Sequence, residues 1–379
     1  MQVKTVIATS VLEFKEKLNI LEQEGFYPSL AIIFSHSEFD NIDIGCFLTD
    51  KKIDFIGCSS AGEIVGGIVY AESISVVFFD MDRSKYFVFK QNIEEEQSYQ
   101  EGLILGEKAK EKFENPAFIS IFGMDLHAEC LLDGLRESLN DEPLIYGGMA
   151  ADDTEAGTPY TFTDNASQPS GFHTIIIDND QIEMNGLATA GWKAIGIEYT
   201  ITKGKDNIVY EINNEPALDF FTDFFGLYTN PSTQTHAVST VNSQYPLQII
   251  RGNETVLRSP FRSNVKEKTF SLTGPIKQGE KFKFSIAPSF DVIEDTIKEF
   301  NKFKENMEGI PDAVILFSCK ARHWAFGPMI EDEVEALGKL WDVPFHGFFC
   351  FGELGKNKDK SVHFFNETCC LMTLKDKQS

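Results

Sequence analysis

The sequence has few of the features that mark membrane, secreted or nucleic-acid-binding proteins. It contains no apolar run of about 18 residues, so we expect no transmembrane helix and no membrane partner. Its seven cysteines form no Cys-x-x-Cys pair, and their scatter over apolar segments indicates reduced, buried thiols in a cytoplasmic protein. Positive charge is scarce: 34 Lys and Arg against 58 Asp and Glu give a formal net charge of −24, which argues against nucleic acid as a partner.

Common metal and phosphate motifs are also missing. The seven histidines form neither His-x-x-x-His nor His-Glu-x-x-His, so we predict no metal site and no covalently attached haem. The pattern G-x-x-x-x-G-E occurs, but a P-loop requires lysine after the second glycine, and an acid there would repel phosphate. The chain begins with too short an apolar stretch for a signal peptide, which favours a cytoplasmic protein.

A glycine turn that occurs three times is the strongest positive signal. Each copy follows an apolar segment typical of a buried strand, and an acid stands six positions after the first glycine. The copies are Gly57–Ile64 (G-C-S-S-A-G-E-I), Gly147–Asp153 (G-G-M-A-A-D-D) and Gly347–Leu354 (G-F-F-C-F-G-E-L). Their acids are Glu63, Asp153 and Glu353. Such repetition indicates that one structural unit has been duplicated.

The segments around each turn follow the order strand, loop, helix, strand, glycine turn, strand. We therefore predict an α+β fold of two domains with mixed β-sheets and flanking helices, built from repeated strand-helix-strand-strand units. Two units fall in the first half of the chain and one in the second, which places the domains at residues 1–200 and 201–379. The polar segment Asn230–Pro246 has no clear period and is expected to be a loop or partial lid.

Several segments resemble the FIST domain family in its N-terminal and C-terminal parts. The N-terminal resemblance rests on F-I-G-C-S-S-A-G-E-I (55–64), Y-G-G-M-A-A-D-D (146–153) and N-N-E-P-A-L (213–218). The C-terminal resemblance rests on F-S-C-K-A-R (317–322), G-F-F-C-F-G-E (347–353) and F-F-N-E-T (364–368). Together these segments extend over about residues 25–375.

The resemblance implies a cytoplasmic sensory protein in signal transduction that binds a small ligand such as an amino acid. One branch of the family is regarded as haem-binding sensors of nitric oxide, so a haem-based sensor is an alternative. Family members are often fused to kinases, cyclases or chemotaxis modules. Because the resemblance takes up nearly the whole chain, we expect the partner to be a separate signalling protein, such as a histidine kinase, a cyclase or a chemotaxis receptor.

The glycine turns and the strand end before Arg322 supply the candidate ligand-binding residues. Arginine presents a planar fork suited to a carboxylate, so we expect Arg322 to bind a ligand carboxylate and an acid to bind its amine. The full set is Cys58, Ser59, Glu63, Gly148, Asp152, Asp153, Cys319, Arg322, His323 and Glu353. Two structural alternatives stay open: turns whose acids only cap backbone N–H groups, and an internal ion pair of Arg322 with Glu353.

Two further chemistries involve histidine and cysteine. His36, His127 and His323 share the loop after the first strand of each unit, where a lone axial histidine could hold haem, although an ordinary loop histidine is the commoner case. Cys58 and Cys319 could serve a thiol-dependent hydrolase, but a buried, inert cysteine is more usual. We therefore predict no catalytic residue and no enzymatic activity.

Overall fold

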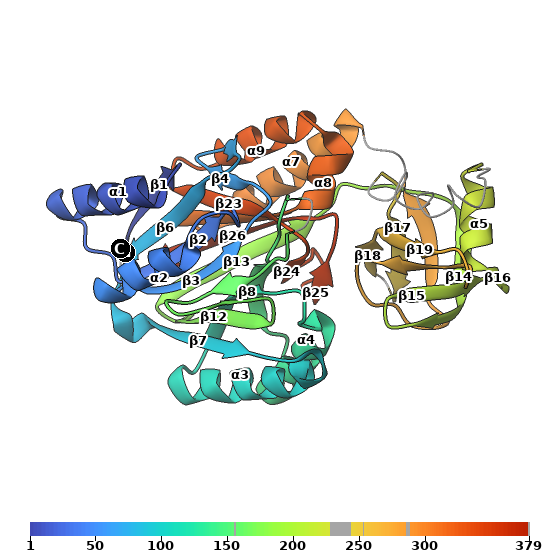
Figure 1. Cartoon of the computed structure of the whole chain (residues 1–379), viewed down its shortest axis with the longest axis horizontal. Helices are drawn as coiled ribbons and strands as arrows, with labels where there is room; N and C mark the ends of the chain where they lie inside the picture. The colour runs from blue at the N-terminus through green and yellow to red at the C-terminus, as the bar shows by residue number, and fades with distance from the viewer. Residues whose placement is uncertain (155–156, 228–243, 253, 286–288, 378–379) are drawn as a thin grey trace.

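Two lobes make up the molecule in this computed structural model, which describes residues 1–154, 157–227, 244–252, 254–285 and 289–377. In the large lobe the sheets lie at the centre and the helices lie outside them, whereas the small lobe stands to one side (Figure 1). Most of the loop expected at 230–246 lies outside the described residues.

Three similar units form the large lobe. The first contains β1 (Gln2–Ala8), α1 (Val11–Gln23), β2 (Leu30–Ser35), α2 (Asn41–Asp50), β3 (Asp54–Ser59), β4 (Glu63–Val65), β5 (Ile68–Tyr70) and β6 (Ile74–Asp80). The second contains β7 (Tyr86–Asn92), α3 (Ser98–Lys112), β8 (Pro116–Phe122), α4 (Ala128–Leu139), β9 (Leu144–Met149), β10 (Thr161–Phe162), β11 (Ser167–Gln168) and β12 (Gly171–Asp178). The third contains β13 (Ile182–Thr189), α7 (Phe290–Glu305), β22 (Ala313–Cys319), α8 (Lys320–Phe326), α9 (Met329–Gly338), β23 (Phe345–Cys350), β24 (Glu353–Lys356), β25 (Val362–Phe365) and β26 (Cys369–Asp376).

Strand pairing follows the same order in all three units. The first strand pairs antiparallel with the last, the last pairs antiparallel with the second, and the second pairs parallel with the third. The short strand after each glycine turn then adds to the sheet of another unit: β4 pairs with β23, β24 with β9, and β10 with β3. The three units therefore form a closed ring with approximate threefold symmetry.

A shared core holds the three units together. One hydrophobic cluster contains the completely buried side chains of Phe34, Ile121 and Phe317, one from each unit. In each unit this residue directly follows the residue of the second strand that pairs with the first glycine of the turn. Phe34 and Phe317, from different units, meet edge to face with ring centroids 6.3 Å apart. The predicted α+β class with mixed sheets and repeated units is confirmed.

The small lobe is inserted into the third unit, between β13 and α7. It contains β14 (Ala194–Lys205), β15 (Ile208–Ile212), β16 (Glu215–Pro216), α5 (Ala217–Phe224), β17 (Leu247–Arg251), β18 (Glu254–Arg258), β19 (Pro260–Asn264), β20 (Thr269–Leu272) and β21 (Lys281–Ser285). Aromatic packing fills its core: the ring of Phe221 lies 5.2 Å from that of Phe270 and 6.4 Å from that of Phe284. The domain boundary predicted after residue 200 falls within β14. Because β13, which precedes this position, pairs with β26, which follows it, one sheet contains strands from both sides of the predicted boundary.

Candidate functional site

Glu63 and Glu353 make the same local contacts in their two units. Oε2 of Glu63 accepts hydrogen bonds from the backbone N–H of Ser73 at 3.2 Å and from its hydroxyl at 2.6 Å. Oε2 of Glu353 accepts the same pair from Thr368, again at 3.2 and 2.6 Å. Burial raises the pKa of each carboxyl to about 7, although these hydrogen bonds lower it. Both acids thus cap backbone N–H groups just before the last strand of their unit.

Asp153, the third acid of the repeat, does not occupy the equivalent place. Thr161 does, because it has the register position on β10 that Glu63 has on β4 and Glu353 on β24. Asp153 belongs to the longer loop before β10, and its carboxylate lies 3.1 Å from Nε2 of His36. Equal spacing in the sequence therefore does not give equal positions in the fold, because the second unit inserts residues between its turn and its short strand.

Close packing accounts for the first glycine of the second and third turns. A Cβ atom on Gly147 would lie 1.9 Å from the carbonyl oxygen of Ser120, and one on Gly347 would lie 2.3 Å from that of Leu316. Such contacts are far shorter than van der Waals distance, so no larger residue fits without moving the neighbouring strand.

Arg322 is fully buried, and the protein itself engages its five N–H donors. Nε and Nη2 donate to the two carboxylate oxygens of Glu333, and Nη2 also donates to a threonine hydroxyl on α7. Nη1 donates to the carbonyl oxygens of Ala190 at 2.6 Å and Glu367 at 3.2 Å. The structural alternative of an ion pair between Arg322 and Glu353 is therefore wrong: the partner is Glu333 on α9. A ligand carboxylate would have to displace Glu333 to reach the guanidinium.

His323 lies near the strand ends with a buried lysine beside it. Its Nδ1 is 3.3 Å from Nζ of Lys320, which also donates to the carbonyl oxygen of Ala61 at 2.6 Å. Burial and the charge of Lys320 lower the pKa of His323 to about 4, so its imidazole is neutral at pH 7.

The remaining polar candidates serve local structure. Oδ1 of Asp152 accepts a hydrogen bond from the backbone N–H of Thr154 at 2.8 Å, and Oγ of Ser59 accepts one from that of Tyr160 at 3.0 Å. Gly148 pairs with the strand β24 and leaves room for its neighbours. A direct ligand contact by any of these residues stays a prediction.

The two candidate thiols are buried. Burial, reinforced by neighbouring carboxylates, raises the pKa of Cys58 and Cys319 well above the ordinary value of a thiol. Both therefore stay protonated at neutral pH, which argues against the hydrolase alternative, since the thiolate is the nucleophile. Of the ten candidate ligand-binding residues, Cys319 is the one found among the described residues that line the adjoining cavities at the lobe boundary, described next.

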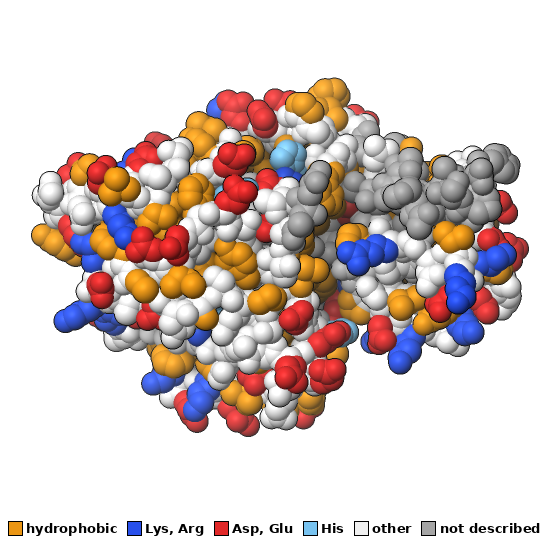
Figure 2. Space-filling model, viewed as in Figure 1, with side chains coloured by type: hydrophobic (Ala, Val, Ile, Leu, Met, Phe, Trp, Pro, Cys, Tyr) orange, Lys and Arg blue, Asp and Glu red, His pale blue; other side chains and the backbone are white. Residues whose placement is uncertain are grey.

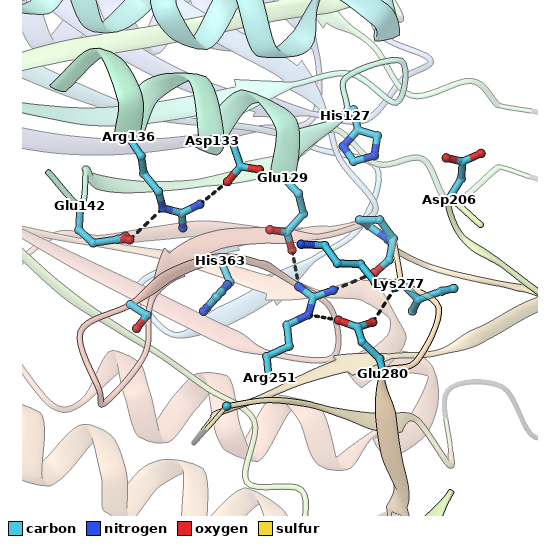
Figure 3. A pocket seen from close by; sticks show the side chains of 14 residues that line it. His127, Glu129, Asp133, Arg136, Glu142, Asp206, Arg251, Lys277, Glu280 and His363 are labelled. Carbon is cyan, nitrogen blue, oxygen red and sulfur yellow. Dashed lines mark hydrogen bonds and ion pairs between the residues drawn. The ribbon is translucent and has the colours of Figure 1, made fainter. Parts of the chain in front are cut away.

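Several cavities at the lobe boundary are lined by residues of both lobes, and three of them adjoin one another. The apolar cavity, of about 300 Å³, is lined by Met124, Met149, Phe261, Leu272, Trp324 and Phe351, together with Cys319 and a polar rim that includes Asn207 and Asn366. The acidic cavity, of about 330 Å³, contains Glu95, His127 and Asp206 and shares Met124, Met149, Asn207 and Thr273 with the apolar cavity. The charged cavity, of about 680 Å³, contains Glu129, Arg136, Arg251, Lys277, Glu280 and His363 and shares His127 and Asp206 with the acidic one (Figure 3).

The cavities follow from the ring architecture. Met149 ends β9, Cys319 ends β22 and Phe351 follows β23, so the apolar cavity lies where strands of the second and third units end. Phe261 and Leu272 face it from the small lobe. In Figure 2 a groove separates the lobes, and acidic side chains gather on its large-lobe side.

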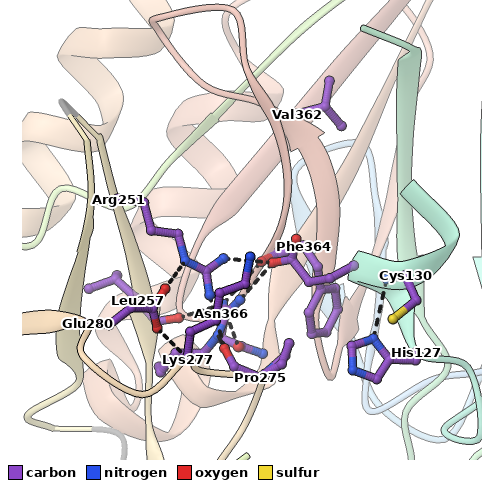
Figure 4. Close-up of polar contacts among 12 residues, drawn as sticks. His127, Cys130, Arg251, Leu257, Pro275, Lys277, Glu280, Val362, Phe364 and Asn366 are labelled. Carbon is purple, nitrogen blue, oxygen red and sulfur yellow. Dashed lines mark hydrogen bonds and ion pairs between the residues drawn. The ribbon is translucent and has the colours of Figure 1, made fainter. Parts of the chain in front are cut away.

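An ionic network crosses the lobe boundary beside the charged cavity. Oε1 of Glu129, in the first turn of α4, accepts hydrogen bonds from Nη1 of Arg251 at 3.1 Å and Nη2 of Arg258 at 3.0 Å. Arg258 is completely buried and also donates to the carbonyl of Phe364 at 3.1 Å and to Oδ1 of Asn366 at 3.2 Å. Figure 4 shows these two acceptor residues together with Arg251 and Glu280. Burial opposes ionisation of Glu129, but the two arginines outweigh it and lower the pKa of its carboxyl.

Family comparison supports a sensory assignment. A model of the FIST N domain matches residues 29–215, and a model of the FIST C domain matches residues 217–356. The chain belongs to the FIST family. These domains are associated with sensory signal transduction and are not known as catalysts. The two matched regions of this FIST protein meet within the small lobe, beside β16.

No curated protein matches the chain. Among the described residues, no group of three or more His, Cys, Asp and Glu is arranged to hold a metal ion, and none of the described helices is long and apolar enough to cross a membrane.

Apart from Cys319 and His127, the residues that line the cavities at the lobe boundary carry no signal in the sequence. Arg258 and Glu129 belong to no motif, and a single arginine at the end of a short strand looks like any exposed charge. Their proximity depends on how the inserted small lobe rests on α4, which no local pattern encodes.

Proposed function

We propose that this FIST protein is a cytoplasmic sensor of a small soluble molecule, an amino acid or a similar compound, which binds between the two lobes. The observation that carries this proposal is that both lobes line the same adjoining cavities. A ligand that contacts both lobes binds more tightly to one relative orientation of the lobes than to other orientations. Binding therefore shifts the population towards that orientation, which is how a sensor converts binding into a signal.

The polar character of the lobe contact supports the same role. Arg251 and Arg258 of the small lobe form ion pairs with Glu129 of the large lobe, and ionic contacts of this kind can exchange partners more easily than a large apolar interface. A change in lobe arrangement would be read by a separate signalling protein, such as a kinase, a cyclase or a chemotaxis receptor. The seven free cysteines support a reducing, cytoplasmic setting.

The first test is a thermal-shift screen with the free amino acids, followed by calorimetry on those that raise the melting temperature. Ala321→Phe should abolish binding, because Ala321 lines the apolar cavity and the larger ring would fill it. Ala71→Phe, at an exposed position away from the cavities, is the matched control and should bind like the wild type. Binding that survives Ala321→Phe unchanged would place the site elsewhere.

Lobe movement can be measured by energy transfer between two dyes. Cys46 is exposed on the large lobe, and Glu215→Cys would supply an exposed thiol on the small lobe, in a Cys130→Ser background that removes the partly exposed third thiol. Transfer efficiency should change with ligand concentration along the calorimetric binding curve. A saturating ligand that leaves the efficiency constant would contradict the coupling between binding and lobe arrangement.

Haem binding by the same protein stays a prediction. His127 lines both the charged and the acidic cavity, whereas its Nδ1 accepts a hydrogen bond from the backbone N–H of Cys130 at 3.3 Å. A sharp Soret band after addition of haemin, lost in His127→Ala, would support the haem-sensor alternative.

A further inference from the structure

We propose that the ligand is a cationic amine with an apolar body, whose body enters the apolar cavity while its ammonium group lies in the acidic cavity. This inference rests on the proposed function and narrows its ligand class. A free carboxylate on the ligand is not required for binding and weakens it.

The apolar cavity determines the body of the ligand. Sulfur and aromatic side chains from both lobes form most of its wall, with Met124 and Trp324 on the large lobe and Phe261 on the small lobe. All three are partly exposed, at 49%, 55% and 42% of their surface, so a ligand would cover apolar area that otherwise faces water. Methionine and aromatic side chains adapt to apolar groups of different shape.

The acidic cavity determines the charge of the ligand. It adjoins the apolar cavity through Met124 and Met149, and its charged side chains are Glu95 and Asp206, one from each lobe. No lysine or arginine is among the described residues that line either the acidic or the apolar cavity. A ligand carboxylate there would meet no lysine or arginine in the wall, whereas an ammonium group would be attracted by both acids, of which Asp206 also lies 4.0 Å from Nζ of Lys205.

Glu95 and Asp206 also act on a thiol beside the acidic cavity. Cys130, in the first turn of α4, is only partly buried, and four carboxylates from both lobes add to its burial in raising the pKa of its thiol. These are the carboxylates of Asp133, Glu129, Glu95 and Asp206, in decreasing order of effect. The net charge of −24 over the whole chain reinforces attraction of a cation from solution.

The arginines of the neighbouring charged cavity do not reverse this preference. Arg251 donates to Glu129 and Glu280, and Arg136 donates to Glu142 and Asp133, so carboxylates already compensate both guanidinium groups. Among the described residues that line the charged cavity, Lys277 is the one lysine. Cavities of about 300 and 330 Å³ lie at the lower end of the usual range for small ligands, roughly 300–1,000 Å³.

Calorimetry with ligands that share one apolar body tests the inference directly. One series is 2-phenylethylamine, phenylalanine and 3-phenylpropionate, and a second is isoamylamine, leucine and 4-methylpentanoate. In at least one series the amine should bind about tenfold more tightly than the amino acid, and the carboxylate should show no binding. The affinity of the amine should also fall as salt is added, because the acids that attract it are screened.

Variants of the two acids give the residue-level test. Asp206→Asn and Glu95→Gln should each weaken amine binding about tenfold, whereas Glu96→Gln, at the exposed neighbouring position, should leave it unchanged. A carboxylate or amino acid that binds more tightly than its amine overturns this inference and leaves the proposed function standing. If neither the amines nor any free amino acid binds, the proposed function fails as well.

Discussion

Glu129 of the large lobe and Arg258 of the small lobe form a buried ion pair, with Oε1 3.0 Å from Nη2. Replacing Arg258 by alanine removes this contact and leaves the carbonyl of Phe364 without its donor. We expect Arg258→Ala to lower the free energy of unfolding by about 3 kcal/mol, since breaking a buried pair leaves an uncompensated charge.

Urea unfolding followed by intrinsic fluorescence would measure this effect. Arg262→Ala is the matched control, because Arg262 is exposed on β19 of the same lobe and should cost under about 0.5 kcal/mol. If the two variants unfold at the same urea concentration, the lobe contact contributes nothing to stability.

Glu367 makes the stability depend on pH. Burial raises the pKa of its carboxyl to about 8, although a hydrogen bond from Ser259 and the charge of Arg322 lower it. The folded state therefore holds this proton more tightly than the unfolded state, whose glutamate pKa is about 4.5. The stabilisation that Glu367 contributes to the free energy of unfolding is fully present below about pH 4.5. It is lost as the pH rises towards 8, because the folded state must then release the proton, and each unit of pKa difference accounts for at most about 1.4 kcal/mol.

Glu367→Gln should remove the part of this slope that Glu367 contributes, because glutamine does not titrate, and should leave the parts due to Glu63 and Glu353. We expect the melting temperature of the variant to fall less than that of the wild type between about pH 5 and pH 8. Glu308→Gln, at an exposed position, is the control and should follow the wild type. Parallel pH profiles for Glu367→Gln and wild type would exclude an effect of this carboxyl.

Arg322 should behave as a structural residue. Lysine keeps the charge but cannot reproduce the fork that holds Glu333 together with the carbonyls of Ala190 and Glu367. Arg322→Lys should therefore destabilise the protein by about 2–4 kcal/mol. The affinity of the remaining folded protein for its ligand should be unchanged in calorimetry. A loss of affinity at full stability would instead return Arg322 to the ligand site.

Gly347 tests the packing explanation of the repeated turn. A Cβ atom at this position would lie 2.3 Å from the carbonyl oxygen of Leu316, so Gly347→Ala must push two parallel strands apart. We expect a loss of about 2–3 kcal/mol in chemical unfolding. Gly25→Ala has open space around its Cβ but a positive φ of 89°, and should cost only about 1 kcal/mol. Equal losses would contradict the packing explanation, because crowding at Gly347 would then cost no more than the unfavourable φ at Gly25.

The sequence alone determined the class of the fold and its repetition. Glycine turns and apolar strands recur because each unit must satisfy the same strand packing, so Gly57, Gly147 and Gly347 are visible without coordinates. The buried capping by Glu63 and Glu353 follows from the same repeat, since each carboxylate binds the start of the last strand of its unit.

Only the tertiary structure decided which side chains meet. Thr161, not Asp153, occupies the third equivalent position, because an insertion shifts the chain after the second turn. Arg322 pairs with Glu333, which follows it on a nearby helix, and not with the acid of the turn. The cavities depend on a lobe inserted between β13 and α7. Contacts between such distant segments arise from the packing of whole elements, and no local period in the chain records them.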